Sequence, residues 1–127
     1  MSIKRYIASK DTTITNAFKS NLSTRGTGSN MGAADVLEVF SIYGQASSGS
    51  VEKTRLLAQF PVSTISSDRT AGTIPASGSV SFYLRLFNAT HAYTLPTNYT
   101  LSITAVSRSW EEGTGYDMEE YKDLTHD

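Results

Sequence analysis

The chain has 127 residues, no cysteine and a formal net charge of −1. Its length favours a single domain that is large enough to bury a core. The lack of cysteine excludes disulfide bonds, thiolate catalysis and cysteine-ligated zinc, and it favours folding in a reducing cytoplasm. No signal-peptide stretch follows the first residues, and no run approaches the roughly 20 apolar residues of a membrane span. We therefore expect a protein made in the cytoplasm without a signal peptide and without a membrane partner.

The first half of the chain combines short strand candidates with loops rich in Gly and Ser. Apolar patterns predict five short strands, over Ile3–Ala8, Thr12–Thr15, Val36–Tyr43, Arg55–Phe60 and Val62–Ile65. Turn residues predict loops over 24–34, 44–50 and 63–78. The Arg55–Phe60 candidate ends at Pro61, which cannot donate a hydrogen bond within a sheet.

The second half contains the two clearest alternating segments, Ser79–Phe87 and Tyr99–Val106. Apolar residues recur at every second position in both, which is typical of half-buried strands. The single tryptophan, Trp110, follows the second segment and is expected to close the core. The predicted structural core therefore consists of Phe60, Phe82, Leu84, Leu86, Leu101, Ile103 and Trp110.

These elements predict an all-β fold, a two-sheet antiparallel sandwich of jelly-roll type, in which residues 1–127 form a single domain. Five of these seven strand candidates are strong, and Thr12–Thr15 and Val62–Ile65 could add two more. A closed jelly roll has about eight strands. Either the sandwich is reduced, or the missing strands lie beyond Asp127 or on a neighbouring molecule. We expect the 127 residues to be the front part of a longer chain.

Charge is distributed unevenly. Residues 111–127 carry −6, whereas residues 1–110 carry +5 without a basic cluster, so nucleic acid is not an expected partner. One interpretation is a solvated acidic end. The sharper hypothesis is an assembly contact, in which apolar residues seat in a groove of a partner and acids set the orientation. Its residues are Met118, Glu119, Glu120, Tyr121, Asp123 and Leu124.

No motif indicates catalysis. His91 and His126 do not fit a hydrolase triad, and the glycines of 25–32 lack the lysine of a phosphate-binding loop. Glu111 and Glu112 are adjacent, so on a strand they would point apart rather than act as a glycosidase pair. We expect no enzyme activity, no cofactor and no catalytic or metal residue, while a calcium site among the terminal acids and a glycan platform of tyrosines stay open.

Several short motifs occur in a characteristic order, namely Asp11–Ile14, Asn30–Gly32, Leu37–Val39, Arg55–Phe60, Ile74–Ala76, Val80–Leu86 and Ser109–Gly113. This order resembles that of DNRLRE-type domains over about residues 6–117. Those domains are carbohydrate-binding-module-like β jelly rolls of secreted bacterial proteins and of phage virion proteins. Pro61 departs from the pattern, because the family often has Asp at that position.

The resemblance implies a non-enzymatic structural component of a phage virion, either a capsid decoration protein or part of a fibre or tail. The start at Met1 without a signal and the lack of cysteine favour this branch over the secreted one. Its expected partners are other virion proteins of the capsid or tail and copies of itself. The alternative is a bacterial carbohydrate-binding or adhesion module.

Overall fold

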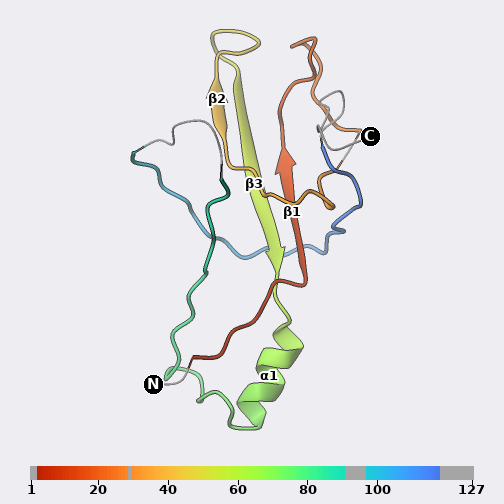
Figure 1. The fold of residues 1–127 in the computed structure, drawn as a ribbon. Helices are drawn as coiled ribbons and strands as arrows, with labels where there is room; N and C mark the ends of the chain where they lie inside the picture. The colour runs from red at the N-terminus through yellow and green to blue at the C-terminus, as the bar shows by residue number, and fades with distance from the viewer. Residues whose placement is uncertain (1–2, 29, 91–96, 118–127) are drawn as a thin grey trace.

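The computed structural model describes residues 3–28, 30–90 and 97–117, and its regular structure is mostly β (Figure 1). Three strands form one antiparallel sheet in the order β1-β3-β2. They are β1 at Lys10–Thr15, β2 at Ser41–Tyr43 and β3 at Val51–Gln59. The longest strand, β3, lies between the two shorter ones, so the outer edges of β1 and β2 form the sides of the sheet.

The β2–β3 hairpin confirms the predicted loop at 44–50. Gly44 has φ of 74°, a left-handed conformation that glycine adopts without steric cost. Its N–H donates to the Ser50 carbonyl at 2.8 Å, and the Ser50 hydroxyl accepts hydrogen bonds from the N–H groups of Ala46 and Ser47. The turn chemistry therefore fixes the pairing of β2 with β3 locally.

The β1–β3 pair confirms the predicted strand at Thr12–Thr15 and most of the one at Arg55–Phe60. Thr12 lies opposite Leu57 and Thr13 lies opposite Leu56. Asn16 extends the pair, because its side-chain oxygen accepts a hydrogen bond from the Lys53 N–H at 2.7 Å. The predicted strand at Ile3–Ala8 is absent, since the chain enters β1 without strand pairing over those described residues.

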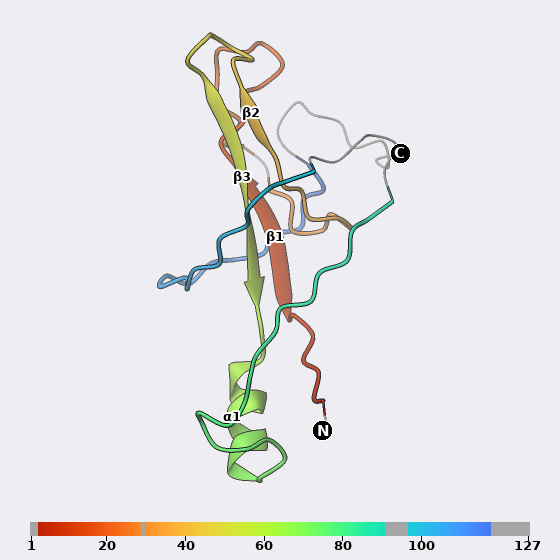
Figure 2. The same ribbon diagram turned by 90° about the vertical axis from the view of Figure 1, so that its left-hand side faces the viewer.

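A helix, α1 at Val62–Thr70, occupies the place where a short strand and a loop were predicted, so that part of the prediction was wrong. Pro61 stands at the N-terminal cap, and Gly72 ends the helix with φ of 74°. The N–H groups of Gly72 and Thr73 donate to the carbonyls of Arg69 and Asp68, which is the Schellman pattern of a helix end. None of its residues is buried, and it extends away from the sheet (Figure 2).

The two best alternating segments form no strand in the structure, which corrects the predictions for 79–87 and 99–106. Both run as open chain without strand arrows (Figure 1). Among the described residues, none of 80–87 or 99–107 takes part in a hydrogen bond. An alternating sequence determines which side chains share a face, but a strand also needs a paired neighbour, and this sheet has none in place for them.

The predicted core is correspondingly wrong for five of its seven residues. Phe82, Leu84, Leu86, Leu101 and Ile103 are exposed, while Phe60 and Trp110 are half-buried. The buried apolar residues among those described are Ala17, Met31 and Ile74, and the buried polar residues are Thr12, Thr13 and Glu52. The core of the described chain is therefore small and partly polar. The described fold is mostly β, with one small sheet and one helix.

Candidate assembly surface

The segment from Ser79 to Phe87 presents large apolar side chains to solvent. Phe82, Leu84 and Leu86 share one phase of the alternation and are 62%, 48% and 54% exposed. Tyr83 and Phe87 in the other phase are more exposed, at 89% and 79%. Residues in the predicted inward phase are therefore less exposed than those in the other phase, although no strand lies beside the segment.

The segment from Tyr99 to Val106 has the same character. Tyr99, Leu101, Ile103 and Val106 are all exposed, and no charged residue interrupts them. Contiguous apolar patches on monomers are usually small, and larger ones mark surfaces for association. We refer to residues 79–87 and 99–106 together as the open segments.

One face of the sheet is also incompletely covered. The pairing places Tyr43 opposite Val51 and Ile14 opposite Arg55, so these side chains lie on the same face. Ile14 and Tyr43 are exposed, and Val51 and Leu57 are half-buried. A half-buried sheet face of this kind is the surface against which a second β layer packs.

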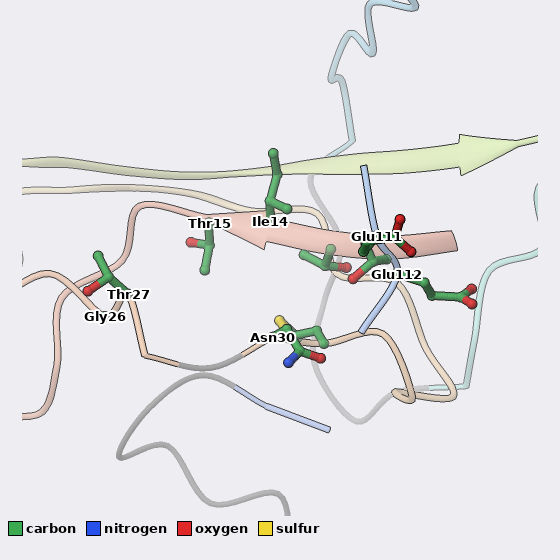
Figure 3. Close-up of a pocket in the computed structure, with 10 residues that line it drawn as sticks. Ile14, Thr15, Gly26, Thr27, Asn30, Glu111 and Glu112 are labelled. Atoms are coloured by element: carbon green, nitrogen blue, oxygen red, sulfur yellow. The ribbon is translucent and has the colours of Figure 1, made fainter. Parts of the chain in front are cut away.

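The start of β1 is held by the residues around Trp110. Glu112 accepts a hydrogen bond from the Asp11 backbone N–H at 2.7 Å. Lys10 Nζ lies 3.5 Å from a carboxylate oxygen of Glu111 and 6.0 Å from the centre of the Trp110 ring. The two acids thus engage their own chain, and Figure 3 shows the chain around them crossing β1.

A close backbone contact joins Asn30 to the same segment. The Asn30 side-chain oxygen accepts hydrogen bonds from the N–H groups of Gly115, at 2.6 Å, and Gly32, at 3.4 Å. A Cβ at Gly32 would overlap the Glu112 carbonyl, and Gly113 has φ of 84°. We call this contact, made by Asn30, Gly32, Glu112, Gly113 and Gly115, the Asn30 clamp.

A cavity of about 340 Å³ lies between β1 and the Asn30 clamp (Figure 3). Its lining combines apolar Ile14 and Met31 with threonines of β1, Thr27, Asn30 and the two glutamates. Asn30 Oδ1 and one carboxylate oxygen of Glu112 already accept hydrogen bonds from backbone N–H groups.

A second internal contact was missed from the sequence and centres on Glu52 of β3, which is 1% exposed. One carboxylate oxygen accepts a hydrogen bond from the Phe18 N–H at 2.8 Å, while the other has no partner among the described residues. The Arg25 guanidinium stacks 3.6 Å from the centre of the Phe18 ring. The Glu52 carboxylate therefore attaches the 16–26 loop to β3, and no sequence motif predicts this contact.

The N-terminal segment is attached to α1 through Asp68. The Tyr6 hydroxyl donates to an Asp68 carboxylate oxygen at 2.7 Å, and Lys4 Nζ lies 3.1 Å from the same oxygen. The hydrogen bond from Tyr6, together with Lys4, holds the pKa of Asp68 below its ordinary value. Desolvation, followed by the contact with Asp68, raises the pKa of Tyr6.

The remaining predicted site residues lie outside the described chain. This applies to Met118, Glu119, Glu120, Tyr121, Asp123 and Leu124, and also to His91 and His126. Within residues 3–28, 30–90 and 97–117, no group of three or more His, Asp or Glu side chains is placed to hold a metal ion. No helix in those ranges is long and apolar enough to cross a membrane.

A comparison with protein-family models matched no family, and searches among curated proteins and among solved structures found no match. The candidate site is therefore defined by the arrangement of the described residues alone. It consists of a small sheet with an uncovered face and two apolar segments that lack strand neighbours.

Proposed function

We propose that this protein is a non-enzymatic structural component of a phage virion, a capsid decoration protein or a part of a fibre or tail, which acts through protein–protein assembly contacts. The observation that carries the proposal is the exposure of the open segments. They hold nine large apolar residues, each at least 48% exposed, namely Phe82, Tyr83, Leu84, Leu86, Phe87, Tyr99, Leu101, Ile103 and Val106.

The free energy available from covering these side chains is large. Burying one such side chain from full exposure contributes about 1.5–3 kcal/mol. Because each is already partly covered, nine of them still offer on the order of 10 kcal/mol before the ordering of the chain is subtracted. Association is the direct way to gain that energy, whereas an enzyme would instead need a preformed, converging set of polar groups.

The two-sheet sandwich belongs to the same proposal. The described chain supplies one small sheet, and the open segments have the alternation of strands that pack against such a sheet. In the assembled state, residues 99–106 belong to the second layer, over the face that carries Ile14 and Tyr43. The jelly-roll type of fold is then completed by assembly rather than by the isolated chain.

The placement of the short motifs supports the resemblance to DNRLRE-type domains. Five of the seven motifs meet at or beside β1, although they are far apart in the sequence. β1 contains Asp11–Ile14 and pairs with the strand that contains Arg55. Thr13 accepts a hydrogen bond from the Glu38 N–H at 3.0 Å, and the Asn30 clamp joins Asn30 to the chain after Trp110.

The acidic end is part of the proposed contact. Replacing Met118, Tyr121 and Leu124 with Ser should weaken assembly more than neutralising Glu119, Glu120 and Asp123. Exposed ion pairs contribute about 0–1 kcal/mol each, so the apolar residues should dominate affinity. Normal incorporation of the Ser variant into particles would show that the segment is only a solvated end.

The proposal is tested on whole particles from a host that carries this gene. Quantitative mass spectrometry of purified virions should find the chain at a fixed copy number relative to the major capsid protein. A density map should then place it on the head or the tail. Absence from intact, washed particles would overturn the proposal.

The carbohydrate-binding alternative would use the cavity beside β1, where Asn30 Oδ1 and one Glu112 carboxylate oxygen already accept hydrogen bonds from the chain. Glycan-array binding by the full chain, lost on replacement of Thr27 and retained on replacement of exposed Ser47, would favour it. Incorporation into virions without glycan binding would favour the structural role.

A further inference from the structure

We propose that the first partner of this chain is a second copy of itself, and that residues 79–87 of each copy add as a strand to the free edge of β2 in the other. This inference rests on the proposed function, since it specifies the contact through which assembly begins. It names both the donated segment and the edge that receives it.

The donated segment runs as open chain, and no described strand pairs with it (Figure 1). Among the described residues, none of 80–87 takes part in a hydrogen bond, and each from Ser81 to Phe87 is exposed. Adding it to a sheet edge would satisfy its backbone groups within a ladder. It would also place Phe82, Leu84 and Leu86 on one face, as their alternation requires.

The two edges of the sheet differ in their availability. At the β1 edge, the Asp11 N–H is already bonded to Glu112, and the chain around Trp110 crosses the strand (Figure 3). At the β2 edge, no described strand pairs with the outer side of Ser41–Tyr43 (Figure 1). Within β2, Ile42 and Tyr43 are exposed, at 39% and 69%.

The edge includes Phe40 as well as β2, because the Thr54 N–H donates to the Phe40 carbonyl at 3.1 Å and the Phe40 N–H donates to the Thr54 hydroxyl at 2.8 Å. Residues 40–43 can therefore accept part of the donated segment. An unpaired, apolar edge is a ready template for such pairing.

A second copy is favoured over a different protein because one chain contains both halves of the contact. Each copy presents an open edge and an unpaired segment, so reciprocal exchange closes both edges at once in an isologous interface. Residues 79–87 carry one charge, Arg85, and 99–106 carry none. Interfaces between permanently associated copies are likewise apolar and depleted of charge.

The first experiment is sedimentation equilibrium of the full chain over a wide concentration range. We expect a dimer or a closed higher oligomer, and Leu84→Lys should weaken it about 100-fold or more, since a charge would enter the buried face. Ser81→Lys is the matched control on the same segment in the opposite phase, and it should change the dissociation constant less than about threefold. A monodisperse, compact monomer at all concentrations would overturn the inference.

The second experiment uses the absence of cysteine. Ser41→Cys and Ser81→Cys chains are oxidised singly and as a mixture, with Ser47→Cys in the β2–β3 turn replacing Ser41→Cys as the control. A disulfide-linked species of twice the chain mass, formed only by the Ser41 and Ser81 mixture, supports exchange at β2. Equal cross-linking from Ser47 would overturn it, and this readout does not depend on the folding of a lysine variant.

The two proposals fail separately. A chain that is monomeric alone but is found at a fixed copy number in virions would overturn strand exchange and leave the virion role standing. A strand-exchanged oligomer that is absent from virions would overturn the virion role alone.

Discussion

Two regions of this molecule were predicted as strands, one around β1 and one at residues 79–87, but only the first forms part of a sheet. In β1, Thr12 and Thr13 are each 3% exposed, although the strand sequence is largely polar. In residues 79–87, which are far more apolar, Phe82 is 62% exposed. The difference shows that apolar content is not sufficient to build a strand. β1 has a partner in register and is held at its start by Glu112, whereas the later segment has neither.

The largest effect should come from breaking the Asn30 clamp, because it holds the first region. Gly32→Ala would place a methyl group against the Glu112 carbonyl, and forced overlap of this kind costs about 3 kcal/mol. Gly49→Ala is the control, since a Cβ there meets nothing within 4 Å. Urea unfolding followed by circular dichroism measures both. Equal stability of the two variants would show that the clamp is not a structural element.

A smaller loss is expected at the buried carboxylate of the same region. Glu52→Ala leaves the Phe18 N–H without its acceptor and should lower the free energy of unfolding by about 1–3 kcal/mol. Glu52→Gln keeps an oxygen in place and should retain most of the stability. If the Gln variant is as unstable as the Ala variant, the charge itself matters more than the hydrogen bond.

The attachment of the N-terminal segment to α1 should depend on pH at both extremes. The pKa of Asp68 is lowered, so its contribution is present above the ordinary carboxyl range, about pH 4, and is lost as the pH falls below it. The pKa of Tyr6 is raised, so its contribution is present up to about pH 10 and is lost at higher pH.

Limited proteolysis near Lys4 and Arg5 measures this attachment. Cleavage should be slow between those limits and faster outside them, with a reference peptide correcting for the protease. Tyr6→Phe removes the hydrogen bond and should make cleavage near Lys4 fast at all pH values. An unchanged pH profile in that variant would contradict the role of the Tyr6–Asp68 pair.

The smallest effect is expected in the second region, when the chain is dilute. Phe82→Ala removes a ring that is already 62% exposed, and substitutions at such surface positions usually change stability by less than about 0.5 kcal/mol. At concentrations where the chain associates, the same substitution should lower stability clearly. A loss of several kcal/mol in the dilute chain would mean that Phe82 is a core residue of the monomer.

Local signals in the sequence predicted part of the first region correctly. Gly44 and the serines after it indicated the hairpin turn, and the predicted strands at Thr12–Thr15 and Arg55–Phe60 fall within β1 and β3. The helix was missed because Val62, Thr64 and Ile65 have β propensity. The signals for α1 lie at its two ends, where Pro61 precedes the first residue and Gly72 follows the last turn. These end signals outweighed the β propensity of the residues in its interior.

The candidate site was predicted less well. Trp110 and the acids after it were singled out as structural, and the Asn30–Gly32 motif was noted, but their contact is visible only in the folded chain. Asn30 and Gly115 are 85 positions apart, so no local pattern could pair them. Glu52 was missed for a related reason, since a lone carboxylate in a strand gives no sign of the loop that will cover it.

By itself, the sequence determined the turns, the phase of each alternating segment and the preference for β structure. These follow from φ preferences, side-chain shape and period-two spacing, all of which act over a few residues. Only the tertiary structure decided which segments find partners. Pairing depends on bringing distant backbone groups into register, and in this chain β1, β3 and the Asn30 clamp achieve it while residues 79–87 and 99–106 do not.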